Sequence, residues 1–132
     1  MQESARRAIN TGLQIQTKLL IANAQRLRDG LSPLDVGIGI NTGEVVTGNI
    51  GSEERFEYTV IGDAVNIAAR VQSISAELGA GLLITKASLD ALGDEVNFVI
   101  RDQGPALLKG KSESVSIFSV NGRKPDSPEL IA

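Results

Sequence analysis

The spacing of apolar side chains changes abruptly at Gly62-Asp63, and this change constrains the fold more than any other feature. Residues 56–61 are rich in aromatic and β-branched side chains, which favours a strand. Beyond the break, four aliphatic residues are spaced four, three and four apart: Ile67, Val71, Ile74 and Leu78. This spacing puts them on one helical face, so we expect a helix over 63–78 with that stripe in the core.

The same two periods predict the other elements. Residues 3–29 have a helical pattern, and 34–40 alternate and return through an "NTG" turn as a second strand over 44–50, which predicts a hairpin. Further elements are expected in order: a buried strand at 81–85, a helix at 86–92 capped by Thr85, and strands at 96–102 and 114–120. Helices alternating with strands indicate an α+β fold, an antiparallel or mixed sheet with helices on one face.

The length of 132 residues predicts one domain over 1–120, followed by a Pro-rich, polar tail over 121–132 that we expect to be disordered. The chain has no cysteine and no histidine, which excludes disulfides, thiolate chemistry, histidine-based triads and zinc sites built on these residues. Any bound metal would need oxygen ligands.

Charge and hydropathy narrow the class of partner. A net charge of −3, with few aromatic residues, argues against nucleic-acid binding. The apolar runs are too short to span a bilayer, and the N-terminus has no signal-like apolar region. We therefore expect a cytoplasmic protein without direct membrane contact.

Two polar side chains on the helix at 63–78 are candidate ligand contacts. Asn66 and Arg70 are four residues apart, so they share a face beside the aliphatic stripe. They either form a solvated helix edge, or Arg70 donates to a phosphate while Asn66 binds a sugar or base. Asp63, at the helix start, is explained by N-capping; a metal site would need a second convergent carboxylate, which no local pattern supplies.

Two further patterns have alternative interpretations. The stretch "GPALLKGKS" is not a Walker phosphate loop, because its glycines at 104 and 110 enclose five residues rather than four. Lys109 and Lys111 are then either solvated or mobile charges for a triphosphate. The glycines at 37, 39, 43, 48 and 51 indicate either close approach of a helix or an interface with another chain.

The stretch "VGIGINTGEVVTGNIGSEERFEYTVIGDAVNIAARVQ", residues 36–72, resembles the central signature of the class III nucleotidyl cyclase catalytic domain, the adenylate and guanylate cyclase family. "GLLITKASLDAL" and "LLKGKSESVSIFSV" are similar to the elements that follow in that family. The resemblance implies a ferredoxin-like cyclase fold, here truncated. It also implies a phosphorus-oxygen lyase that converts ATP to cyclic AMP and pyrophosphate at the interface of two catalytic domains.

The resemblance assigns roles to five residues. Asn66 resembles the family's ribose-orienting asparagine, and Arg70 the arginine that stabilises transition-state charge. Thr59 stands at the base-reading position, where threonine favours ATP. Lys109 is similar to the triphosphate-binding lysine, with Lys111 as the alternative if the alignment slips by two residues.

This sequence also departs from the family pattern. The two aspartates that hold Mg²⁺ or Mn²⁺ in the family precede the helix at 3–29, so we expect no metal to be bound by this chain alone and essentially no activity from it. Asp35 replaces a phosphate-contacting arginine of many members. We expect part of an adenylate cyclase domain or, alternatively, a non-catalytic nucleotide-binding and dimerisation module that complements an intact domain. An exposed sheet edge and apolar surface on the first helix predict a homodimer, domain-swapped or sheet-extending.

Overall fold

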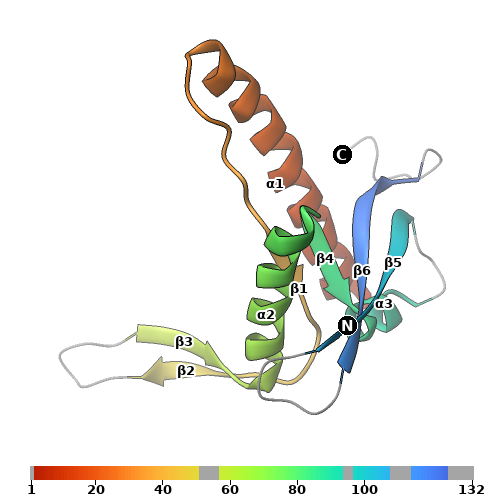
Figure 1. Cartoon of the computed structure of the whole chain (residues 1–132). Helices are drawn as coiled ribbons and strands as arrows, with labels where there is room; N and C mark the ends of the chain where they lie inside the picture. Colours follow the sequence, from red (N-terminus) through yellow and green to blue (C-terminus); the bar gives the residue numbers. More distant parts are fainter. Residues whose placement is uncertain (1, 51–56, 94–96, 108–113, 125–132) are drawn as a thin grey trace.

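The computed structural model describes residues 2–50, 57–93, 97–107 and 114–124, with the backbone alone described for 46–50 and 57–61. Figure 1 shows the elements in chain order: α1 (Gln2–Arg28), β1 (Ile38–Ile40), β2 (Val46–Ile50), β3 (Glu57–Ile61), α2 (Asp63–Leu78), β4 (Leu82–Thr85), α3 (Lys86–Leu92), β5 (Phe98–Leu107) and β6 (Ser114–Arg123). None of the described helices is long and apolar enough to cross a membrane.

Within these ranges, four strands form one mixed sheet in the order β1-β4-β6-β5. β1 runs parallel to β4, whereas β6 is antiparallel to both β4 and β5. The expected α+β class and mixed sheet are confirmed.

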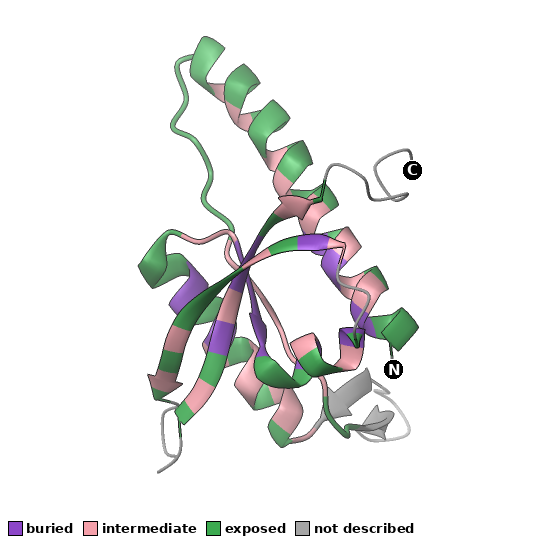
Figure 2. Ribbon diagram, turned by 90° about the vertical axis from the view of Figure 1, so that its right-hand side faces the viewer, coloured by how far each residue is buried: buried purple, intermediate pink, exposed green. Residues whose placement is uncertain are grey.

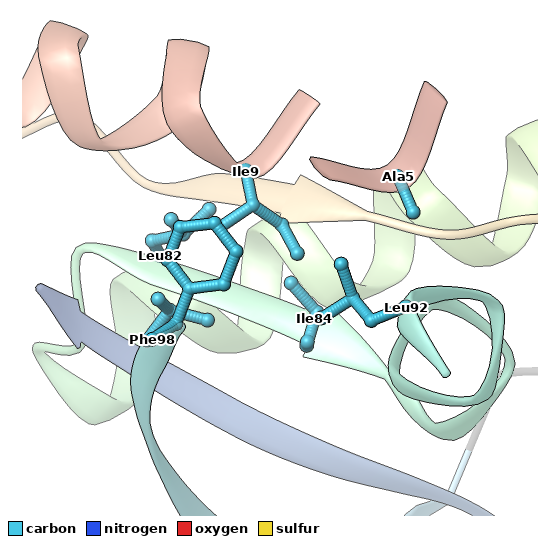
Figure 3. Packing of buried hydrophobic residues seen from close by; sticks show 7 residues of the cluster. Ala5, Ile9, Leu82, Ile84, Leu92 and Phe98 are labelled. Carbon is cyan, nitrogen blue, oxygen red and sulfur yellow. The ribbon is translucent and has the colours of Figure 1, made fainter. Parts of the chain in front are cut away.

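Helices cover both faces of this sheet, so the expectation that they lie on one face is wrong. Leu82 and Ile84 of β4 pack with α1 and α3, whereas Leu83 between them packs against α2. All four residues of β4 are buried, and a strand that is apolar on both faces must be covered on both. Figure 3 shows Ile9 and Ala5 of α1 above Leu82, Ile84, Leu92 and Phe98.

The predicted hairpin over 34–50 is also wrong. β2 pairs antiparallel with β3 in a separate two-stranded sheet, and β1 pairs with β4 instead. Asn41, directly after β1, explains the difference, because its amide donates to the carbonyl oxygen of Ala64 at 3.1 Å and its oxygen accepts from the Thr85 hydroxyl at 2.6 Å. These bonds hold the end of β1 against α2 and β4, and the β2-β3 ribbon projects away from the larger sheet (Figure 1).

α2 lies close to the backbone of β1, and this accounts for three of the glycines. A Cβ atom on Gly39 would lie 2.6 Å from the carbonyl oxygen of Ala68, and one on Gly43 would lie 2.8 Å from the Cβ of Ala64. Gly37 likewise faces the backbone of α2. Close approach of a helix of the same chain therefore explains these positions. Gly48 lies in β2, and position 51 is outside the described residues.

The two halves of α1 have different environments. Ala5, Ile9 and Gly12 are buried, but Leu20 is 73% and Ile21 68% exposed. Figure 2 shows the exposed outer half of α1 extending beyond the sheet. The apolar surface expected on this helix is therefore present.

The segment after α1 is tied to that helix rather than to the sheet. The Asn23 amide donates to the Leu34 carbonyl oxygen at 2.9 Å, and the Leu34 amide donates to the Asn23 side-chain oxygen at 2.7 Å. The amide and the carbonyl oxygen of Leu34 are thus both bonded to Asn23 rather than to a strand. The strand predicted over 34–40 begins only at Ile38.

The last two strands are longer than expected. β5 continues to Leu107, with register irregularities before Ile100 and Gly104, and β6 continues past Val120 to Arg123. The Arg123 guanidinium donates to the Asn10 side-chain oxygen at 2.8 Å. Residues 121–123 of the expected tail thus belong to the sheet, while 125–132 lie outside the described residues.

Candidate nucleotide site

α2 follows β3 directly and carries both polar candidates. Its N-cap is Gly62, with φ of 154°, a conformation that glycine adopts more readily than any other residue. Asp63 is the first helical residue, so the prediction of Asp63 as the N-cap is wrong. Its carboxylate still lies in the first turn, where negative charge is favoured by the helix dipole.

The aliphatic stripe fixes the orientation of α2. Val71 and Ile74 are buried against Leu83 and Ile117 of the sheet, and Ile67 packs beside them. The predicted stripe is therefore core at these positions, but Leu78 is 53% exposed and was wrongly included. With that face held by the sheet, Asn66 is exposed and Arg70 is half-buried.

The guanidinium of Arg70 has one weak partner among the described residues. Its Nη1 lies 3.9 Å from Oε1 of Glu77, and the two side chains are 37% and 66% exposed. Its Nε is buried and has no hydrogen-bond partner within the described part of the chain. A solvent-screened ion pair of this kind contributes little, so Arg70 is not locked in an internal salt bridge and can donate to a ligand.

The structure does not describe the side chains of the other three candidates. Thr59 lies in β3 with its Cα opposite that of Gly48, and its side chain is outside the description. Lys109 and Lys111 lie outside the described residues. The structure thus brings Asn66 and Arg70 onto one helix and leaves Thr59 and the two lysines as sequence-based predictions.

Few carboxylates lie around the candidate site. No group of three or more acidic side chains converges anywhere in the described ranges. Glu44 and Asp63 line a cavity of about 360 Å³ between β1, α2 and β4, whose other polar lining residues include Asn41, Thr42 and Thr85. We therefore assign no metal ligand to these residues.

A polar network that the sequence patterns did not identify lies beside this cavity. The hydroxyls of Thr42 and Ser88 lie 2.9 Å apart, next to the bond between Thr85 and Asn41. Residues 41–43 have ordinary turn composition, so the only available signal was that polar residues follow two apolar strands. The network connects the ends of β1 and β4 to the start of the helix that carries Asn66.

A sequence profile described as "Adenylate and Guanylate cyclase catalytic domain" matches residues 1–122. The chain belongs to this family. The resemblance found in the sequence is therefore confirmed over nearly the whole chain.

Individual relatives agree with this assignment. The chain is 35% identical to the terminal-differentiation specific adenylate cyclase of Dictyostelium discoideum, covering 98% of this chain and 6% of that protein. It is 33% identical to adenylate cyclase 1 of Rhizobium meliloti, covering 89% of this chain and 17% of the relative. It thus spans less than a fifth of either curated relative.

Solved cyclases have the same fold. The guanylyl cyclase Cya2 superposes with a TM-score of 0.79 at 38% identity, over 97% of this chain and 63% of that one. The adenylyl cyclase CyaB from P. aeruginosa superposes with a TM-score of 0.83 at 31% identity, over 96% of this chain and 63% of that one. The chain thus spans less than two thirds of either solved chain, and these neighbours include both an adenylyl and a guanylyl cyclase.

Proposed function

We propose that this chain supplies the nucleotide-contacting residues of an adenylate cyclase domain, which makes cyclic AMP and pyrophosphate from ATP for intracellular signalling. One observation carries the proposal: in a cyclase-family chain, Arg70 lies half-buried one helical turn from exposed Asn66, with its Nε unpaired within the described residues. Such a guanidinium has donors available for phosphate oxygens.

Each candidate residue has a role in this reaction. The ribose 3′-hydroxyl attacks the α-phosphorus, and pyrophosphate leaves. Arg70 donates hydrogen bonds to the charge that develops on the phosphate oxygens, and Asn66 orients the ribose. Thr59 reads the adenine, while Lys109, or Lys111 in its place, binds the triphosphate.

The complete site requires a second cyclase domain. No three acidic side chains converge among the described residues. We infer that the Mg²⁺ or Mn²⁺ ligands of the complete site lie outside this chain, and that the chain alone is essentially inactive. The exposed apolar residues of α1 favour a homodimer, either domain-swapped or sheet-extending. The expected location is the cytoplasm.

The alternative function is a non-catalytic nucleotide-binding and dimerisation module that complements an intact cyclase domain. It is favoured by the same lack of converging carboxylates within the described ranges. In that case Thr59, Asn66, Arg70 and Lys109 would complete the site of the partner.

A complementation assay tests the proposed function. The chain is mixed with a full-length cyclase domain whose own counterparts of these four residues are disabled, and cyclic AMP and cyclic GMP formation are measured from ATP and GTP. We expect cyclic AMP from the mixture and none when the added chain carries Arg70→Ala. Failure of the unchanged chain to restore activity would contradict the assignment of these residues.

A further inference from the structure

The Arg70 side chain leans away from Asn66. Arg70 and Glu77 are seven residues apart on α2, which corresponds to a rise of about 10.5 Å along the helix axis. Helical side chains normally lean toward the N-terminus, so a Glu77 carboxylate pointing that way covers only part of this rise. For Nη1 to come within 3.9 Å of Oε1, the guanidinium must extend toward the C-terminal end of α2. Asn66 is one turn in the opposite direction.

This position of the guanidinium is only weakly stabilised. Both side chains of the pair are substantially exposed, so solvent screens their attraction. The buried Nε has no acceptor among the described residues, and an unsatisfied buried donor is unfavourable. A phosphate group offers several acceptor oxygens and a larger negative charge, so it can replace Glu77 and also satisfy the remaining donors of Arg70.

We propose that Glu77 is a positioning residue that holds Arg70 in a resting orientation and competes with the nucleotide phosphates for its guanidinium. The inference rests on the proposed function, because it takes Arg70 as the phosphate contact. Binding then moves the guanidinium from Glu77 toward Asn66, so that both side chains reach one nucleotide. Glu77 thereby opposes nucleotide binding in the ligand-free chain.

A binding measurement tests the competition. ATP, with a chelator to remove divalent cations, is titrated calorimetrically into the full chain and into the variants Glu77→Gln, Arg70→Ala and the double variant. Loss of a competing exposed ion pair should tighten ATP binding by up to about fivefold in Glu77→Gln. The same substitution should have no effect in the Arg70→Ala background. Asp90→Asn, which removes one exposed carboxylate from α3, controls for net charge and should leave affinity unchanged.

Solvent exchange of the Arg70 Nε proton, followed by NMR, tests the resting orientation without nucleotide. Because Nε is buried in the resting orientation, its proton should exchange slowly in the unchanged chain. Exchange should be faster in Glu77→Gln, where the ion pair that holds this orientation is lost. Equal exchange rates in the unchanged chain and in Glu77→Gln would overturn the role of Glu77 alone. The same conclusion would follow if Glu77→Gln bound ATP with unchanged or weaker affinity while Arg70→Ala still weakened ATP binding. ATP binding that is unaffected by Arg70→Ala would overturn the proposed function, and this inference with it.

Discussion

The hydroxyl of Thr85 donates a 2.6 Å hydrogen bond to the side-chain oxygen of Asn41, which joins the ends of two parallel strands. Asn41 in turn donates to the carbonyl oxygen of Ala64 in the first turn of α2. Thr85 also accepts from the backbone amide of Ser88 at 3.4 Å and so caps α3. One amide side chain therefore connects the sheet to the helix that carries Asn66 and Arg70.

Replacing Asn41 should destabilise the fold. In Asn41→Leu the fully buried Thr85 hydroxyl loses its acceptor, and the carbonyl of Ala64 loses a donor. We expect the free energy of unfolding, measured by urea denaturation, to fall by about 1–3 kcal/mol. The control Gln14→Leu alters an exposed residue of α1 and should change it by less than about 0.5 kcal/mol. Equal stability of both variants would contradict a structural role for the Asn41 bonds.

A methyl group at position 39 should separate α2 from the sheet. In Gly39→Ala the new Cβ meets the carbonyl oxygen of Ala68, which is helix backbone and cannot rotate away. We expect a loss of about 1–3 kcal/mol in thermal or chemical unfolding. Gly12→Ala is the matched control, because its Cβ would lie 3.0 Å from the methyl end of the Leu82 side chain rather than from helix backbone, and alanine favours the helix. A Gly39→Ala variant no less stable than Gly12→Ala would rule out the close packing.

The exposed apolar residues of α1 should mediate self-association. The double variant Leu20→Glu, Ile21→Glu places charge on side chains that make little contact within the chain, so its stability should change by less than about 1 kcal/mol. Analytical ultracentrifugation at micromolar concentration should show a dimer for the unchanged chain and a monomer for the variant. Gln14→Glu, at an exposed position of the same helix, should still form the dimer. A monomeric unchanged chain would contradict the proposed homodimer.

The start of α1 should respond to acid. A hydrogen bond from Arg7, together with the positive charge of Arg6 and a hydrogen bond from it, holds the pKa of the Glu3 carboxyl below its ordinary value of 4.5. Because the folded pKa is the lower one, this stabilisation is present above the unfolded pKa and is lost as pH falls through the folded value. Residues 6–9 donate their amides to the carbonyl oxygens of the first turn, so we expect exchange of these amides to increase as pH falls below 4.5, relative to exchange elsewhere in the helix. Glu3→Gln should abolish that pH dependence.

Local sequence determined the elements around the candidate site. The bounds of α2 agree with the predicted 63–78, and β4, α3 and the Thr85 cap also lie where the pattern indicated. Helical spacing and N-capping act over three to seven residues, so neighbouring side chains alone specify them. The family signature likewise resides in one continuous stretch, which made membership recognisable and gave Asn66 and Arg70 their predicted roles.

Only the tertiary structure decided how these elements meet. β1 pairs with β4 rather than with β2, and helices cover both faces of the sheet. These outcomes depend on contacts between residues far apart in the chain, such as Asn41 with Thr85 and Gly39 with Ala68. The direction of the Arg70 guanidinium was undetermined for a related reason: helical spacing fixes the face on which a side chain lies, whereas packing and charge around it select its rotamer.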